Sequence, residues 1–448
     1  MHTAEPGAVT ATDLEIAVLG PPRHPSPLAS TLVERRSSLH WVDEGDRVLF
    51  DDTLGIAAGR DVPISLLPSM EPGGPRRRLY FDPATARAGV VSCGGLCPGI
   101  NDVVRGLVLQ LAQYGVRTVL GFRNGYLGLV PPLGEEPLEL TPASVRGIDR
   151  QGGSLLGTSR GAQDPEAVVD TLQRHGLDML FVIGGDGTLR GAAAIAAAAR
   201  ARRADIAVVG VPKTIDNDIP YIDHSFGFQT AFARAAESIR AAQVEAAATP
   251  YGVGLVKLMG RHSGFIACYA SLACHDVDVV LVPEVPFTLD GPRGVLEFVR
   301  RKVEEQGHAV VVLAEGAGQD LVPPDGAGAA DASGNLRLAD IGGLLRRRLT
   351  EHFAEHRMGL NLRYVDPGYA IRSVPANGYD GVYCTRLAHA AVHAALSGRT
   401  EMIVGRWHGR FVHLPIALVT GVRNVVDPEG DLWLTVLETT GQPPVFDG

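Results

Sequence analysis

The sequence predicts an α/β protein with two doubly wound, mostly parallel, Rossmann-like sheets and an N-terminal extension. Strand and helix patterns alternate along most of the chain, and this alternation is typical of parallel sheets covered by helices. The 448 residues suggest roughly two or three domains at about 150 residues each. Hydrophobic residues make up 45% and charged residues 20%, so the chain has enough apolar material for large cores.

The first series of elements begins at Ala88. An apolar run there predicts a short buried strand, and the following helix ends at Gly115, as glycine-terminated helices do. Asp164 as N-cap and Pro165 in the first turn predict the start of another helix. The predicted order is strand 88–92, helix 101–115, strand 117–122, helix 165–175, strand 178–183, helix 188–201 and strand 206–211.

The same alternation continues through the second half of the chain. A long alanine-rich helix begins near Phe228, and apolar strands then alternate with shorter helices. The predicted order is helix 228–248, strand 252–258, helix 264–273, strand 277–282, helix 293–305 and strand 309–314.

Charge and composition exclude several classes of protein. Lys and Arg number 41 and Asp and Glu 50, and the net charge of −9 predicts no nucleic-acid partner. Residues 1–21 lack the pattern of a secretory signal, and no run of 18 apolar residues occurs, which predicts a cytoplasmic protein without a membrane partner. The odd count of five cysteines indicates reduced thiols rather than a disulfide framework.

Unusual residues gather where the predicted strands end, which is the edge at which parallel sheets bind ligands. Gly94 to Gly99 reads equally well as a tight turn or as a loop that lets backbone approach a phosphate. In Gly184-Gly185-Asp186-Gly187-Thr188, a lone carboxylate among glycines suits Mg²⁺ and phosphate oxygens. Neither a P-loop nor a dinucleotide fingerprint competes for this role.

The segment Pro212-Lys213-Thr214-Ile215-Asp216-Asn217-Asp218 also follows a strand directly. Two carboxylates two residues apart, with a hydroxyl and an ammonium nearby, form a candidate proton acceptor, metal partner and phosphate contact. An Asx-rich turn is the structural alternative. Because the segment ends at the same sheet edge as Asp186, we favour the functional interpretation.

Three further segments supply arginines, whose planar fork binds phosphate through two hydrogen bonds. They cover residues 153–160, 257–264 and 363–380. Taken singly, each arginine is weak evidence for a phosphate site.

Two patterns invite a metal interpretation that we disfavour. His352-Phe353-Ala354-Glu355-His356 matches the H-x-x-E-H pattern of some zinc peptidases, but the predicted helix 344–356 is strongly charged, as solvated faces are. Cys93 and Cys97 lack a second cysteine pair and are interpreted as structural thiols.

Taken together and in this order, the segments resemble the phosphofructokinase family, most closely its longer ATP-dependent branch of plants and trypanosomatids. The resemblance spans roughly residues 88–442. It rests on Gly94 to Asn101, Gly152 to Gly161, Gly184 to Thr188, Pro212 to Asp218, Met259 to Arg261, Glu315, and Arg372 to Asp380.

The resemblance implies transfer of the ATP γ-phosphoryl group to the 1-hydroxyl of fructose 6-phosphate, a step of glycolysis, with Mg²⁺ as cofactor. It also implies allosteric control and a homo-oligomer, either dimer or tetramer. The regions it predicts are residues 1–87 as an irregular extension, 88–226 plus about 365–410 as a nucleotide-binding domain, 227–364 as a sugar-phosphate domain and 411–448 as a C-terminal segment on the core. Within the extension, the run Arg76 to Arg78 is interpreted as a solvated surface rather than an anion site.

The resemblance also implies roles for individual residues. Asp216 is the expected general base, Asp186 positions Mg²⁺, and Asp218 supports the metal and the loop. Thr214, Arg160 and Arg261 are expected to stabilise the moving phosphoryl group. The remaining expected contacts are Gly95, Gly185, Gly187, Thr188 and Lys213 to the nucleotide, and Met259, Gly260, Glu315, Arg363, Tyr369 and Arg372 to the sugar phosphate.

Two positions bear on the phosphoryl donor. Pyrophosphate-dependent relatives carry an aspartate where this chain has Gly187, which favours ATP. Lys213 is the residue expected in pyrophosphate enzymes, although the long ATP branch also pairs glycine with lysine. A pyrophosphate-dependent enzyme and a non-catalytic regulatory subunit therefore remain alternatives, and NAD and lipid kinases share only the G-G-D-G-T segment.

Overall fold

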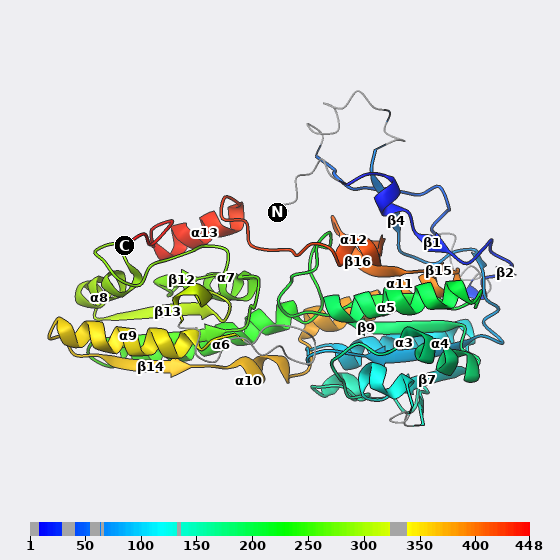
Figure 1. Ribbon diagram of the computed structural model, residues 1–448, viewed down its shortest axis with the longest axis horizontal. Coiled ribbons are helices and arrows are strands. Elements are labelled where there is room, and N and C mark those ends of the chain that lie inside the picture. The colour runs from blue at the N-terminus through cyan, green and yellow to red at the C-terminus, as the bar shows by residue number, and fades with distance from the viewer. Residues whose placement is uncertain (1–8, 29–40, 54–62, 64–66, 132–135, 323–337) are drawn as a thin grey trace.

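The computed structural model describes residues 9–28, 41–53, 63, 67–131, 136–322 and 338–448. Two α/β units lie side by side, and each has a central sheet between layers of helices (Figure 1). The predicted fold class is therefore confirmed. In the part of the chain that is described, no helix is long and apolar enough to cross a membrane.

The first sheet has nine strands in the order β3-β4-β17-β16-β10-β9-β6-β7-β8, and its central strands from β16 to β7 are parallel. The bounds are β3 Val48–Leu49, β4 Ser69–Pro72, β6 Arg87–Ser92, β7 Thr118–Phe122, β8 Leu138–Glu139, β9 Met179–Gly184, β10 Ala207–Pro212, β16 Met402–Trp407 and β17 Arg410–Pro415. Alternate strand residues pack on opposite faces. Helices α3 (Ile100–Tyr114) and α11 (Gly378–Leu396) cover one face, and α4 (Pro165–Arg174) and α5 (Asp186–Ala201) cover the other.

The second sheet has four parallel strands in the order β12-β13-β11-β14. Their bounds are β11 Gly252–Leu258, β12 Val279–Leu281, β13 His308–Ala314 and β14 Asn361–Val365. Helices α6 (Phe228–Ala247) and α7 (Phe265–Leu272) cover one face, and α8 (Val295–Gln306) and α9 (Ile341–Glu355) cover the other. The shorter elements are β1 Ala17–Val18, β2 His24–Pro25, β5 Arg78–Leu79, α10 Gly368–Arg372, β15 Arg399–Thr400, α12 Ile416–Val419 and α13 Asp431–Thr440.

Every element predicted between residues 88 and 314 is present, with each end shifted by at most two residues. The predicted helix signals are also present: Asp164 caps α4 by accepting a hydrogen bond from the Glu166 amide, and Gly115 ends α3 with a φ of 93°. All five cysteines are buried and free, as reduced thiols would be. The division into regions stays a prediction.

The extension is more ordered than predicted, because β4 pairs with β17 and so lengthens the first sheet. The prediction of a solvated arginine run is wrong at Arg76, which is only 2% exposed. Its guanidinium binds Glu44 at 3.0 Å and Glu71 at 2.6 Å. Arg399 binds the same two carboxylates at 2.6 and 2.9 Å, and His413 contacts Glu71 at 2.9 Å.

We call these five residues the ionic cluster. Burial disfavours the charge of Glu71, but its contacts with His413, Arg399 and Arg76 outweigh burial and lower its pKa. The cluster therefore holds three residues of the extension against Arg399 of β15 and His413 of β17.

The prediction that helix 344–356 presents its histidines on a solvated face is only partly right. His356 is exposed, but the His352 side chain is only 15% exposed and lies 3.3 Å from Glu297 on α8. The apolar side of α9, with Leu345, Leu349 and Phe353, is buried in the core between the second sheet and its helices.

Asp380 of α11 connects the two α/β units through buried hydrogen bonds to the start of α6. Its carboxylate is fully buried and accepts hydrogen bonds from the Gly227 amide at 3.0 Å, the Thr230 amide at 2.7 Å and the Thr230 hydroxyl at 2.6 Å. The first turn of α6 is thus capped by a side chain from α11, because Gly227 has no side chain of its own to cap it.

We expect Asp380→Ala to lower the free energy of unfolding by about 3 kcal/mol or more, because it leaves two amides and a hydroxyl without an acceptor. Chemical denaturation followed by circular dichroism measures the loss. Asp276→Ala, which removes an exposed aspartate, is the control and should stay within about 0.5 kcal/mol of the parent. Equal stability of the two variants would contradict the capping role.

Candidate active site

The glycine-rich segments meet at a topological switch point of the first sheet. Strand β6 lies between β7 and β9, so the chain leaves β6 toward one side and later returns on the other. Ligands bind at the carboxyl ends of strands at such a point. The loops after β6, β9 and β10 therefore share one edge.

Lys213 joins these three loops. Its ammonium donates a hydrogen bond to the Gly95 carbonyl at 2.6 Å, and its amide donates to the Gly184 carbonyl at 3.0 Å. The side chain is buried, and burial lowers the pKa of its ammonium. Lys213 therefore holds these loops together through its hydrogen bonds, whether the phosphoryl donor is ATP or pyrophosphate.

The segment that ends at Arg160 packs against the first loop. The Gly94 amide donates to the Ser159 carbonyl at 2.8 Å, and the Thr158 hydroxyl donates to the Gly94 carbonyl at 2.6 Å. Arg160 itself is exposed, and a β-carbon placed on Gly95 would lie 3.8 Å from its guanidinium. The fold thus brings the predicted nucleotide contacts Gly95 and Arg160 together.

Asp186 is the first residue of α5, two residues earlier than the helix predicted there. Its Oδ2 accepts a hydrogen bond from Arg190 at 2.5 Å, while its Oδ1 is buried without a partner among the described residues. Gly185, Gly187 and Thr188 surround this helix end, where amides point outward and favour negative charge. A free carboxylate oxygen beside a phosphate-binding helix end fits Mg²⁺.

Asp216 lies in the loop after β10. Its amide donates to the Thr214 hydroxyl at 3.1 Å, and its carbonyl accepts from Ser263 of the second domain at 2.7 Å. Its Oδ1 is buried without a partner in the described residues. Burial, and then the charges of Asp218 and Glu315, raise the pKa of Asp216 to about 7. A carboxylate of this kind is suited to accepting a proton near neutral pH.

The structure adds two residues that the sequence analysis missed. Arg423 binds the Asp218 carboxylate at 3.3 Å. The amide of Asn424 donates to the Asp218 carbonyl at 2.9 Å, and its side chain donates to the Asn217 carbonyl at 3.0 Å. Asn217 has a φ of 57°, so a loop in an uncommon conformation is held by the C-terminal segment. No local sequence signal links residues so far apart in the chain.

The second domain contributes the loops after β11 and β13. The Glu315 amide donates to the Leu258 carbonyl at 2.9 Å, and the Gly316 amide donates to the Gly260 carbonyl at 3.0 Å. A β-carbon on Gly316 would lie 2.0 Å from the Arg261 carbonyl, so only glycine permits this approach. Arg261 is thereby held beside Glu315, with Met259 just before it.

Burial raises the pKa of Glu315, and the charges of Arg261, Lys257 and Arg372 oppose that effect. Arg372 lies in α10, which follows β14. Tyr369 lies beside it, 76% exposed, with the Arg372 guanidinium 4.9 Å above its ring. The Arg372 guanidinium is thus stacked on an exposed aromatic ring.

Arg363, which is expected to contact the sugar phosphate, lies apart from the other residues expected to do so. It lies in β14 opposite Gly254 of β11, and its guanidinium faces Glu245 of α6 at 3.6 Å. The other expected sugar-phosphate residues lie after the strand ends, whereas Arg363 lies within a strand. In this chain Arg363 thus pairs with Glu245 of helix α6 rather than with Asp216.

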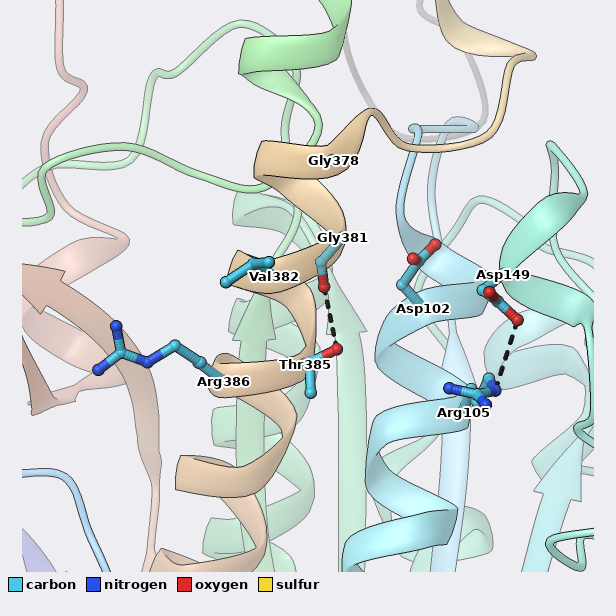
Figure 2. Close-up of a pocket in the computed structure, with 8 residues that line it drawn as sticks. All are labelled: Asp102, Arg105, Asp149, Gly378, Gly381, Val382, Thr385 and Arg386. Carbon is cyan, nitrogen blue, oxygen red and sulfur yellow. Dashed lines mark hydrogen bonds and ion pairs between the residues drawn. The ribbon is translucent and has the colours of Figure 1, made fainter.

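A separate pocket opens between α3 and α11. Figure 2 shows its charged side chains, with an ion pair between Arg105 and Asp149 at 3.4 Å. Burial and the charge of Asp149 raise the pKa of Asp102 there to about 6. The residues that line it are Asp102, Arg105, Asp149, Gly378, Gly381, Val382, Thr385 and Arg386. None of them belongs to the set expected around Asp216.

Asp186 and Asp216, each with one carboxylate oxygen that has no partner among the described residues, lie among glycine-rich loops at one sheet edge, an arrangement that suits an α/β enzyme of phosphoryl transfer. Residues 87–395 match the family model described as phosphofructokinase. The chain belongs to the phosphofructokinase family.

Several relatives are similar along nearly the whole chain. The ATP-dependent 6-phosphofructokinase of Amycolatopsis methanolica is 57% identical over 97% of this chain and 96% of its own length. The ATP-dependent 6-phosphofructokinase of Trypanosoma cruzi is 40% identical over 98% and 90%. ATP-dependent 6-phosphofructokinase 7 of Arabidopsis thaliana is 47% identical over 83% and 76%. The resemblance to the plant and trypanosomatid branch is thereby confirmed.

Solved structures agree on the fold. The pyrophosphate-dependent phosphofructokinase of Marinobacter aquaeolei superposes with a TM-score of 0.66, at 22% identity, over 80% of this chain and 91% of its own. The phosphofructokinase of Saccharomyces cerevisiae gives 0.62, at 22% identity, over 80% and 47%. At such identity these likenesses show the fold alone.

Proposed function

We propose that this chain is an ATP-dependent 6-phosphofructokinase, which transfers the ATP γ-phosphoryl group to the 1-hydroxyl of fructose 6-phosphate. The observation that carries the proposal is the Asp216 carboxylate, which is buried, has a free oxygen and lies where both domains meet. The family and the names of its relatives support the donor and the acceptor.

Asp216 accepts the proton of the 1-hydroxyl as that oxygen forms its bond to the γ-phosphorus. The bond from the γ-phosphorus to the bridging oxygen breaks, and ADP leaves with the electron pair. Thr214, Arg160 and Arg261 stabilise the charge on the moving group, which is the main catalytic effect in this reaction class. Asp218, held by Arg423, keeps the loop in place.

Asp186 would hold Mg²⁺ through its free oxygen, and the ion supplies charge neutralisation on the phosphates when bound. Gly95, Gly185, Gly187, Thr188 and Lys213 surround the nucleotide phosphates in this proposal. Met259, Gly260, Glu315, Tyr369 and Arg372 form the sugar-phosphate side. A cytoplasmic location is part of the proposal, because five free cysteines suit a reducing compartment.

A coupled assay that compares ATP with pyrophosphate across phosphorylated sugars tests the proposal. We expect turnover with ATP, fructose 6-phosphate and Mg²⁺. Faster turnover with pyrophosphate would favour the pyrophosphate-dependent alternative, to which Lys213 points. Substrate binding without turnover would favour a regulatory subunit, and phosphorylation of NAD would overturn the assignment.

The pH dependence of activity tests the role of Asp216. Since its raised pKa is about 7, the base form is lost as pH falls through 7, and kcat/KM should fall with it. Glu315→Gln removes one of the charges that raise this pKa, so the midpoint of the profile should move to lower pH. An unmoved midpoint would contradict this electrostatic coupling.

We also propose that the protein works as a homo-oligomer, a dimer or a tetramer. Arg363 supports this, because it lies apart from the catalytic loop of its own chain and is half-exposed. In an oligomer it would serve the 6-phosphate of a neighbouring site. Light scattering of the purified chain measures the oligomer, and a monomer with full activity would contradict the proposal.

A further inference from the structure

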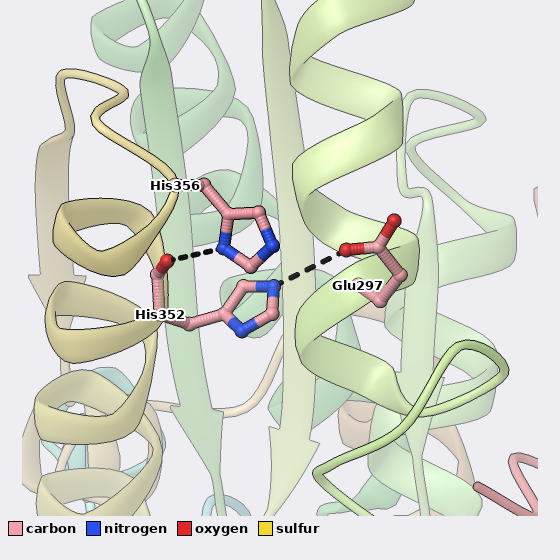
Figure 3. Close-up of side chains that lie close together, drawn as sticks. All are labelled: Glu297, His352 and His356. Carbon is pink, nitrogen blue, oxygen red and sulfur yellow. Dashed lines mark hydrogen bonds and ion pairs between the residues drawn. The ribbon is translucent and has the colours of Figure 1, made fainter.

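Helices α8 and α9 bring together three side chains that metals prefer. Glu297 lies in the first turn of α8, and His352 and His356 lie four residues apart at the end of α9. Their ligand atoms all lie within 4.8 Å of one another, and no other such group of three occurs in the residues that the structure describes. Figure 3 shows both imidazole rings facing the gap toward the carboxylate, with ring centroids 4.4 Å apart.

Two of these side chains, His356 and Glu297, are oriented by a contact outside the group of ligand atoms. Nδ1 of His356 donates to the His352 carbonyl at 2.8 Å, which leaves its Nε2 as a free ligand atom. Nε2 of His352 already lies 3.3 Å from Oε2 of Glu297. Arg300 holds that carboxylate through two hydrogen bonds of 2.8 Å. Metal ligands in proteins are oriented by such outer partners.

The chemistry of the three side chains selects a class of ion. Two imidazoles and one carboxylate suit Zn²⁺ and similar first-row ions, and three protein ligands leave one position open. Mg²⁺ prefers oxygen ligands and is a poor competitor. The Glu297 carboxylate accepts hydrogen bonds from Arg300 through both oxygens, as an ionised carboxylate does. The nearby charges of Arg300 and Arg301 oppose the binding of a cation.

We propose that Glu297, His352 and His356 bind one Zn²⁺-class ion per chain and so link α8 to α9. The site differs from the H-x-x-E-H arrangement of zinc peptidases, because Glu355 is exposed and lies outside the group. It also differs from the phosphoryl-transfer site, since both helices lie on a face of the second sheet and no predicted active-site residue belongs to them.

Zn²⁺ titration of the metal-free full chain, at constant millimolar Mg²⁺ and against a chromogenic chelator, tests the proposal. We expect one Zn²⁺ per chain. His356→Ala and Glu297→Gln should each weaken binding by about tenfold or more, as the loss of a ligand requires. Glu355→Gln is the matched control for Glu297→Gln, because it removes the same charge from α9, next to His356, and it should bind as the parent does.

Two further measurements separate this site from incidental binding. Co²⁺ in place of Zn²⁺ should give visible absorption of a four-coordinate site, which His356→Ala abolishes. Zn²⁺ should raise the unfolding temperature of the parent but not of His356→Ala, because binding to the native state stabilises it. Since His356 is exposed, that variant should fold and keep its phosphotransferase activity.

Weak binding that exceeds one ion per chain would overturn the proposal. Parent-like affinity in both His356→Ala and Glu297→Gln would do so too, as would a loss of affinity in Glu355→Gln. The buried thiols are poor rival ligands, since all five cysteines are enclosed in the cores.

Discussion

Asp216→Asn is expected to lower kcat by roughly 10²- to 10⁴-fold, which is the range that general base catalysis contributes. Asparagine has the shape of aspartate but cannot take the proton of the sugar hydroxyl. The loop should keep its form, because its bonds to Thr214 and Ser263 use the backbone of residue 216. The KM values for ATP and fructose 6-phosphate should therefore change little, and steady-state kinetics measure both effects.

Asp164→Asn is the matched control, since it makes the same chemical change at an exposed helix cap where the two residues serve equally well. It should leave kcat unchanged. A loss of kcat below tenfold in Asp216→Asn, with the control unaffected, would remove Asp216 from the role of base.

Gly187→Asp is expected to lower kcat/KM for ATP by about tenfold or more, because like charges brought together cost several kcal/mol. The fold has room for the side chain: a β-carbon on Gly187 would find its nearest neighbour, Arg190, at 3.9 Å. Acidic residues also suit the first turn of a helix, so α5 should remain stable. The new carboxylate would then oppose the nucleotide phosphates without disturbing the fold.

Gly187→Asn separates charge from bulk in this test, because asparagine has nearly the same volume and no charge. We expect it to keep more ATP activity than Gly187→Asp when both are assayed at saturating fructose 6-phosphate. Unchanged kcat/KM for ATP in Gly187→Asp would show that this position does not select the donor.

Local patterns were sufficient for the elements that carry the site. The apolar run before Gly94 and the cap at Asp164 act within a few residues, so β6 and α4 could be predicted closely. The predicted strand ends then placed Asp186 and Asp216 at one edge of the sheet, and the resemblance implied their roles. The position of each of their free oxygens could not be predicted, because it depends on which neighbours the fold supplies.

Contacts between distant parts of the chain account for the errors. Arg76 belongs to a charged run and should be solvated by composition, yet it binds Glu44, 32 residues away in the chain. His352 is turned inward by Glu297, more than fifty residues away in sequence. Arg423 reaches Asp218 across about two hundred residues. Periodicity and spacing describe neighbours along the chain, so they could not show these pairs.

The ionic cluster makes the extension part of the folding unit. A chain truncated to begin at residue 88 would lose Glu44 and Glu71, and the nearly buried Arg399 would be left without a counter-ion. Leaving a buried charge without a counter-ion lowers the free energy of unfolding by about 3 to 5 kcal/mol. Because β16 joins β17 to β10, the strand that carries the catalytic loop, such damage would lie two strands from Asp216. The extension, which is irregular by composition, thus supports the strands next to the Asp216 loop.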